Sequence, residues 1–279
     1  MKQSKLGKAI RYILMLFVCI IYIFPFFWMV MNSFMSEGAI FSLPPKFIGD
    51  LLFTDKMWYN YAMVFSQYSF GRYMVNSIFV ATLAAVGQII VCTISGFALA
   101  KMNFKGKGIV FATLMVTLMV PVQVTIIPEY YIFMKLGWMD TFLPLIIPSF
   151  LAGAFGTFMM KEFFEQVPSA LFDAGIIDGV NSWQMYRRIY LPQASSSIST
   201  LFIIAFMNNW NDLLRPMLYI SSKERYTLTI GLTHFQNQYN VKWSYLLAGS
   251  VVSVLPLVVV FCFCQRWIIQ NTMNSGIKG

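Results

Sequence analysis

The chain has 279 residues, of which 58% are hydrophobic and only 11% are charged, and its mean hydropathy is +0.66. Soluble domains usually carry about 25% charged residues, so this composition excludes an ordinary soluble domain and predicts a multi-pass membrane protein. The formal charge of +9 could suggest nucleic-acid binding. The basic residues flank apolar runs, however, so topology and anionic lipid headgroups explain them better, and no nucleic-acid partner is expected.

Six apolar runs, bounded by charges and turn residues, are each long enough to cross a bilayer. They occupy residues 11–32, 75–100, 108–132, 141–161, 199–220 and 245–267. A membrane-crossing helix needs about 20 residues, and a helix satisfies its own backbone hydrogen bonds in lipid. The predicted fold class is therefore an all-α membrane protein of six transmembrane helices in a single domain, 1–279. Pro121 is expected to bend the third helix within the span.

The distribution of positive charge predicts the orientation of these helices. If the N-terminus is inside, twelve of the 20 Lys and Arg residues lie inside and eight lie outside. The N-terminal cluster and the loop 101–107 count most, because short segments beside a span determine topology. Both termini and the loop 162–198 are therefore expected to be cytoplasmic.

Several kinds of site are missing from the sequence. It contains no GxxxxGK[ST] phosphate-binding loop, so the chain is not expected to hydrolyse ATP. His234 is the only histidine, which leaves no Ser-His-Asp set, and there is no cluster with metal-ligand spacing. The four cysteines lie in apolar spans and are interpreted as small buried hydrophobes. We expect no catalytic residue, no metal and no cofactor in this chain.

The loop 162–198 carries a short run of small and acidic residues. Ala174, Gly175 and Gly179 have little side-chain bulk, which would let another protein approach the backbone closely. Asp173, near the start of the predicted helix, would be favoured by the helix dipole and could cap free amides. An ordinary cytoplasmic helical hairpin accounts for these residues equally well.

The fifth span contains polar groups that are costly to expose to lipid. They are Asn208, Asn209, Asn211 and Asp212, which surround Trp210. Amides and an indole suit a sugar, whose hydroxyls need donors and acceptors and whose ring stacks on an aromatic face. Hydrogen bonding to a partner helix is an equal alternative. Arg215 follows Asp212 by three residues and could pair with it.

Several motifs together resemble one transporter family. Ile177-Asp178-Gly179 and Leu191-Pro192 match the cytoplasmic EAA consensus of binding-protein-dependent ABC importer permeases, whereas Asp173-Ala174-Gly175 departs from its first triplet at two positions. The resemblance covers most of the chain. Its ending is similar to that of the shorter permease subunit of maltose-type, carbohydrate-importing transporters. The other matching segments are Arg72–Ser77, Phe97–Lys101, Phe104–Gly106, Pro121–Gln123, Trp210–Asp212, Gln265–Trp267 and Gly276–Gly279.

The resemblance implies the type I ABC importer permease fold in a prokaryotic cytoplasmic membrane. It implies that helix 169–180 is seated in a cleft of an ATP-binding subunit. The coupling residues would be Asp173, Ala174, Gly175, Asp178 and Gly179. It also implies a second, different permease subunit, two ATP-binding subunits that hold ATP and Mg, and an extracellular or periplasmic solute-binding protein.

The polar loop between the fifth and sixth spans is a further candidate site. By resemblance to maltose-type permeases, it could reach into the docked binding protein and help to dislodge the solute. Its residues are Gln236, Asn237, Gln238, Tyr239 and Asn240. A solvated turn, with Trp243 anchored at the membrane interface, is the alternative.

The function predicted from these observations is import of a sugar or oligosaccharide, with this chain forming half of the translocation path. Residues 208–212 are the path candidates. Import of glycerol phosphate or a polyol by the same kind of machinery is an alternative. A stand-alone ion-coupled secondary transporter is a rival from another class, although such carriers normally need an intramembrane acid or histidine relay and Asp212 is the lone candidate. A membrane-embedded enzyme would need paired catalytic groups, which the sequence lacks.

Overall fold

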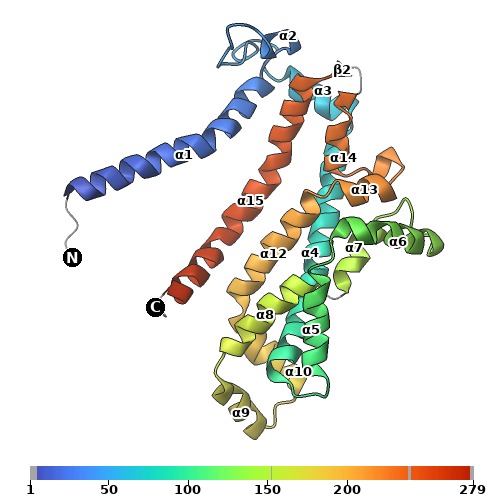
Figure 1. Cartoon of the computed structure of the whole chain (residues 1–279). Helices are drawn as coiled ribbons and strands as arrows, with labels where there is room; N and C mark the ends of the chain where they lie inside the picture. Colours follow the sequence, from blue (N-terminus) through green and yellow to red (C-terminus); the bar gives the residue numbers. More distant parts are fainter. Residues whose placement is uncertain (1–4, 152, 238–239, 277–279) are drawn as a thin grey trace. The chain divides into compact units, whose positions relative to one another are not determined.

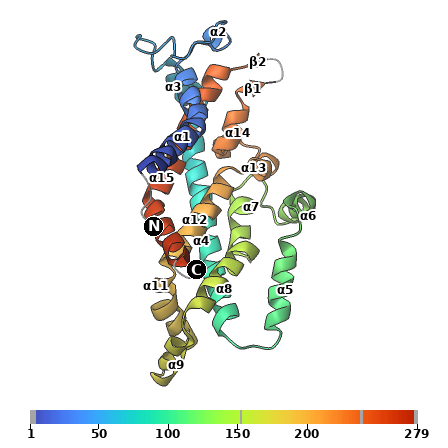
Figure 2. The same cartoon turned by 60° about the vertical axis from the view of Figure 1, so that its left-hand side comes forward.

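The computed structural model describes residues 5–151, 153–237 and 240–276, and its helices are drawn in Figures 1 and 2. These residues belong to two compact units, which are described separately. The first unit comprises residues up to Gly71 together with Gly231–Leu255. The second comprises Arg72–Ile230 and the residues from Pro256 onward. Two long helices, α4 (Phe70–Lys101) and α15 (Trp243–Gly276), supply residues to both units.

Within the described residues, four helical runs are long and apolar enough to cross a membrane. They are α1 (Lys5–Ser33), α4, the run of α7 (Leu143–Ile146), η1 (Ile147–Phe150) and α8 (Ala154–Gln166), and α15. Two bent pairs bring the number to six if each pair is one span. The first pair is α5 (Lys107–Thr117) with α6 (Val122–Lys135). In the second pair, one arm is the continuous run of α10 (Ser182–Gln184), η2 (Met185–Tyr190) and α11 (Leu191–Gln193), and the other arm is α12 (Ser195–Trp210). A multi-pass membrane protein is thus supported, while the six-span count stays a prediction.

Two of the predicted spans differ from the observed helices. The run 108–132 is not one kinked helix, because α5 and α6 meet at 100° (Figures 1 and 2). Pro121 is the residue before α6 and has an extended backbone with ψ 139°. The helix α5 already ends at Thr117, and residues 118–120 form a turn before Pro121. Because proline has no N–H, the helical hydrogen-bond ladder cannot continue through this position, and the run breaks instead of bending. The run 199–220 is also interrupted, since α12 ends at Trp210 and α13 (Leu214–Tyr219) is a separate short helix.

The first unit is organised by polar contacts among its short segments. Asn60, in α3 (Tyr59–Gln67), donates to the backbone carbonyls of Ser33 and Met35 at 2.8 and 2.9 Å. Glu37, in α2 (Glu37–Ile40), accepts hydrogen bonds from the backbone N–H of Trp243 at 2.9 Å and from the Ser244 hydroxyl at 2.7 Å. A carboxylate here satisfies free amides at the start of α15, and its negative charge interacts favourably with the positive end of the helix dipole.

A short sheet is the one departure from an all-helical fold within the described residues. The strands β1 (Gln236–Asn237) and β2 (Asn240–Val241) pair antiparallel in the first unit. The remaining short elements, in chain order, are α9 (Ser169–Ile177), η3 (Lys223–Arg225) and α14 (Leu228–Thr233).

In the second unit, α8 packs against both α5 and α12. Small residues allow α4 and α8 to approach each other closely. A Cβ added at Gly96 would lie 2.7 Å from the Met160 Cβ and 2.9 Å from the Lys161 backbone nitrogen. Glycine therefore sets this helix separation, as small residues do at many helix contacts in membranes. Buried residues around this contact include Cys92, Phe97, Phe164 and Leu201.

We expect Gly96→Ala to destabilise the second unit by roughly 1–3 kcal/mol, because the added methyl overpacks a contact made partly of backbone. Thermal unfolding of the purified protein in detergent measures this effect. Gly108→Ala is the matched control, since a Cβ at Gly108 in α5 meets nothing within 4 Å. The control should be neutral or slightly stabilising. Equal unfolding temperatures for the two variants would contradict the packing described.

Candidate functional site

The helix α9 in the loop 162–198 ends in a motif that requires glycine. Gly179 has φ +72°, its N–H donates to the Ile176 carbonyl at 3.0 Å, and Val180 N–H donates to the Gly175 carbonyl at 2.9 Å. These two bonds close the end of a helix through a left-handed residue, which glycine adopts without strain. A Cβ at Gly179 would meet no atom within 4 Å. The backbone conformation, and not close packing, accounts for this glycine.

Two local expectations for the loop are wrong. Gly175 is buried, and a Cβ there would lie 2.5 Å from Cε of Met185, so its small size serves packing inside the chain rather than the approach of a partner. Asp173 is exposed and is the fifth residue of α9, so it does not cap the helix. The residue that precedes α9 is Pro168, which makes no side-chain capping bond. The coupling roles of these residues stay predictions.

A set of exposed apolar side chains on the same loop was missed by the sequence analysis. Ile177 is 86% exposed, Ile176 is 58% exposed and Trp183 is 58% exposed. The helix α9 lies at one end of the second unit, beyond α8, in Figures 1 and 2. Neighbouring exposed apolar residues of this size typically mark an interaction surface. The sequence indication was present in the two isoleucines that precede Asp178-Gly179.

The loop is held to α4 by buried and charged contacts. The Tyr186 and Thr93 hydroxyls are hydrogen-bonded at 2.8 Å in the interior. Lys101 Nζ, at the end of α4, donates to the Val167 carbonyl at 2.7 Å and lies 5.6 Å from the centre of the Tyr190 ring. These contacts join the loop to α4.

The amide-rich segment predicted to line a path lies at the end of α12 and the turn after it, not in the middle of a helix. Asn208, Asn209 and Asp212 line a polar hollow of about 260 Å³. The other lining residues are Gln88, Pro148, Ser149, Gly153 and Arg215. Asn211 is exposed but is not among the residues that line the hollow. Three of the five predicted path residues are thus brought together.

Trp210 is in a different position from the one expected. It is only 3% exposed, and its ring stacks on Phe206 with the centroids 5.5 Å apart. An indole held in this way is not available to stack on a sugar. Trp210 instead anchors the end of α12 in the protein interior, which fixes the direction in which the neighbouring amides project.

The charged residues around the hollow pair differently from the expectation. Arg215 contacts Asp212 through its backbone, with the N–H 3.3 Å from the Asp212 Oδ1. Its guanidinium Nε lies 3.8 Å from Oε2 of Glu129, an acid of α6 that the sequence analysis did not select. Glu129 also accepts hydrogen bonds from the Thr125 hydroxyl at 2.8 Å and the Tyr219 hydroxyl at 3.3 Å. As a single acid inside a predicted apolar span, Glu129 could have been noticed from the sequence.

A separate carboxylate holds the segment that follows α13. Asp140 accepts hydrogen bonds from the Ser222 hydroxyl, from the Ser222 and Ser221 amides at 2.8 and 3.0 Å, and from the Arg225 guanidinium at 2.9 Å. These donors, led by the Ser222 hydroxyl, lower the pKa of Asp140 to about 2. The Asp140 amide in turn donates to the Tyr219 carbonyl at 2.8 Å. Asp140 therefore helps to position Tyr219 beside Glu129.

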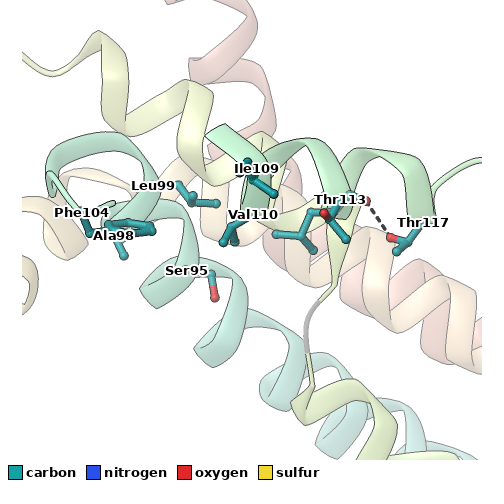
Figure 3. Close-up of a pocket in the computed structure, with 9 residues that line it drawn as sticks. Ser95, Ala98, Leu99, Phe104, Ile109, Val110, Thr113 and Thr117 are labelled. Carbon is teal, nitrogen blue, oxygen red and sulfur yellow. Dashed lines mark hydrogen bonds between the residues drawn. The ribbon is translucent and has the colours of Figure 1, made fainter. Parts of the chain in front are cut away.

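A larger hollow of about 510 Å³ lies between α4 and α5 and has a different character (Figure 3). Its lining residues are Ser95, Ala98, Leu99, Phe104, Ile109, Val110, Thr113, Leu114 and Thr117. The Thr117 hydroxyl is already used, since it donates to the Leu114 carbonyl at 2.6 Å. This mostly apolar lining offers little to a hydroxyl-rich solute, so the smaller polar hollow is the better candidate for cargo.

The polar loop between α14 and α15 is a short hairpin. Gln236 pairs with Val241 and Asn237 pairs with Asn240, and the Lys242 N–H donates to the Phe235 carbonyl at 2.9 Å. Gln238 and Tyr239 lie outside the described residues. The described backbone thus shows two paired strands, while contact with a binding protein stays a prediction.

Comparison with known families gives a match over much of the chain. The model described as "Binding-protein-dependent transport system inner membrane component" matches residues 93–273. The permease protein AraQ of the arabinooligosaccharides transport system from Halalkalibacterium halodurans is 28% identical over 94% of this chain and 94% of its own. UgpE of the sn-glycerol-3-phosphate transport system from Brucella abortus is 29% identical, and the match covers 98% of this chain and 99% of UgpE. LacG of the lactose transport system from Rhizobium radiobacter is 26% identical, and the match covers 98% of this chain and 97% of LacG.

Solved structures share the fold. A chain of a bacterial ABC transporter involved in the import of the acidic polysaccharide alginate superposes with a TM-score of 0.81 and 19% identity, covering 95% of this chain and 99% of that one. A chain of a bacterial alginate ABC transporter in complex with an alginate pentasaccharide-bound periplasmic protein gives a TM-score of 0.67 and 16% identity, covering 94% and 96%. At these identities the likeness establishes the fold alone.

We expect Asp140→Asn to lower stability at neutral pH by roughly 0.5–1 kcal/mol, a modest amount because water screens a partly exposed charge. The folded-state pKa of about 2 lies below the unfolded value of about 3.9, so the Asp140 contribution is present above pH 4 and is lost as pH falls towards 2. The readout is the difference in unfolding temperature between wild type and variant across this range.

Asn is the matched replacement at position 140 because the residue has φ 56°, which Asn tolerates better than most residues. Asp140→Ala should therefore be more damaging than Asp140→Asn. A difference between wild type and Asp140→Asn that stays constant from pH 6 to pH 2 would show that the carboxylate charge does not contribute.

Proposed function

This chain belongs to the family of binding-protein-dependent transport system inner membrane components, and on that premise we propose that it forms half of the translocation path of an ATP-driven importer for a sugar or oligosaccharide. The observation that carries the cargo assignment is the polar hollow at the end of α12, where Asn208, Asn209 and Gln88 offer amide donors and acceptors. Relatives named for arabinooligosaccharide and lactose transport support this choice. Glycerol phosphate is the second candidate, since UgpE is similarly close.

We further propose that α9 couples the path to a partner ATPase. The proposal rests on the exposed apolar side chains Ile176, Ile177 and Trp183, on the exposed acids Asp173 and Asp178, and on the left-handed Gly179 that ends the helix. Ala174 is exposed on the same helix. Burial of these isoleucines in a cleft of an ATP-binding subunit would supply docking free energy. The contacts between the loop and α4 would then pass a rigid-body movement into the membrane helices.

The proposed assembly contains a second, different permease subunit, two ATP-binding subunits that hold ATP and Mg, and an extracellular or periplasmic solute-binding protein. The hairpin 236–240 is proposed to contact that binding protein. The assembly would lie in a prokaryotic cytoplasmic membrane, with both termini and α9 on the cytoplasmic side, as the excess of Lys and Arg predicts.

Reconstitution tests the energy source. The complex co-purified with this chain is placed in vesicles, and uptake of a labelled oligosaccharide is measured with ATP or with an imposed ion gradient. We expect uptake to require ATP and the binding protein and to be independent of the gradient. Uptake driven by the gradient without ATP would instead identify a secondary transporter.

Within that assay, Ile177→Asp should weaken ATPase attachment by tenfold or more, because a charge is placed where an apolar side chain is buried on docking. The side chain is 86% exposed, so the permease itself should fold normally. Co-purification of the ATP-binding subunit and ATP-driven uptake are the measurements. Ile177→Val is the matched control and should retain both. Normal assembly and uptake in Ile177→Asp would exclude this surface as the docking site.

Replacing residues 236–240 with a Gly/Ser linker of equal length tests the hairpin. If the hairpin contacts the binding protein, uptake and binding-protein-stimulated ATP hydrolysis should fall several-fold while basal hydrolysis is unchanged. Assembly of the complex, measured by co-purification, is the control for folding. Unaltered uptake at every solute concentration would leave a solvated turn as the interpretation.

A further inference from the structure

The polar hollow at the end of α12 combines amides with a charged group on one side. Gln88 comes from α4, Ser149 from η1, and Asn208 and Asn209 from α12. Asn209 uses its Nδ2 to donate to the Ala205 carbonyl at 2.8 Å. Amides of this kind satisfy hydroxyl groups, which both donate and accept hydrogen bonds.

The charges at the hollow do not balance. Arg215 is 36% exposed at its side chain, and the nearest carboxylate to its guanidinium is that of Glu129, 3.8 Å from Nε. The second carboxylate, Asp212, also lines the hollow and is bound to the Arg215 amide. One guanidinium thus faces two carboxylates, which makes these three described groups negative by one unit when all are ionised.

This arrangement differs from an anion-binding site. An arginine that recognises phosphate or carboxylate on a ligand presents a free planar fork of N–H donors. Here the guanidinium lies near a fixed carboxylate, since its Nε is 3.8 Å from Oε2 of Glu129, and Glu129 is itself held by Thr125 and Tyr219. An entering anion would meet two carboxylates, Glu129 and Asp212, as well as the single Arg215 charge.

We propose that this hollow admits neutral polyhydroxyl cargo and disfavours phosphorylated or otherwise anionic cargo, with Asp212 and Glu129 as the residues that set this preference. The inference rests on the proposed function, which places the hollow on the translocation path. Family membership alone does not decide the cargo charge, because the relatives are named for neutral oligosaccharides and for glycerol phosphate. A phosphoester carries about −1.5 to −2 charges at neutral pH, so repulsion by the hollow would be larger for it than for a monoanion.

The local charge can be measured without any cargo. Asn208→Cys is introduced into the intact complex after Cys19, Cys92, Cys262 and Cys264 have been replaced. Rates of modification are then compared for a cationic trimethylammonium methanethiosulfonate and an anionic sulfonate methanethiosulfonate, each normalised to its rate with a free thiol. Asn208 is exposed, so its replacement should be reachable by both reagents. The cationic reagent should react faster.

Removing a carboxylate should lower this preference by a predictable amount. One unit charge at several ångströms in a largely aqueous setting changes each rate roughly threefold, in opposite directions for the two reagents. Asp212→Asn should therefore reduce the ratio of cationic to anionic rates about tenfold, and Glu129→Gln should reduce it in the same direction. A change in access alone alters both rates together and cancels in the ratio.

Removing the positive charge of Arg215 should change the ratio of cationic to anionic rates in the opposite direction. Arg215→Gln should raise the ratio, whereas Arg215→Lys, which keeps the charge, should leave it near the wild-type value. A ratio that favours the anionic reagent in the wild type, or that is unchanged in both Asp212→Asn and Glu129→Gln, would overturn the proposal. ATP-driven uptake is measured separately, so failure of the charge prediction with normal uptake leaves the proposed transport function intact.

Discussion

The close approach of α4 and α8 at Gly96 and Met160 is the contact on which the second unit depends. With no side chain at Gly96, the Met160 Cβ and the Lys161 backbone lie where a Cβ would otherwise be. This allows the Phe97 and Phe164 rings to meet edge to face and to pack against Tyr190. The ring centroids of Phe97 and Tyr190 are 5.2 Å apart. Because lipid is as apolar as these side chains, close packing rather than hydrophobic burial supplies the stabilisation.

The same cluster connects the membrane helices to the loop proposed to receive the ATPase. Tyr190 belongs to η2, a π-helical turn that follows α10, and it packs beside the end of α4. Met185, from the same turn, fills the space left open by Gly175 of α9. The loop is thus built into the interior of the unit instead of hanging from it. Packed side chains and two buried hydroxyls therefore connect this loop to α4.

At the other end of α12, irregular backbone creates the polar hollow. The helix stops at Trp210, where Asn211 and Asp212 offer side-chain groups that compete with helical hydrogen bonding. The Thr229 hydroxyl donates to the Asp212 carbonyl at 2.7 Å, which satisfies a backbone group that the helix no longer uses. Non-helical backbone in a membrane protein is tolerated where it is buried in protein or lines a water-filled cavity. A translocation path provides such a setting.

The sequence by itself determined the class of protein, the family, the positions of the apolar runs and the small-residue loop, because these depend on composition, periodicity and local motifs. It also brought Asn208, Asn209 and Asp212 forward, since amides in an apolar run are unusual. Only the tertiary structure decided that Trp210 is buried, that Gly175 packs against Met185 and that the Arg215 guanidinium lies by Glu129 rather than Asp212. Those outcomes depend on which distant segments meet: Glu129 and Arg215 are far apart in the chain, and no local pattern encodes their distance.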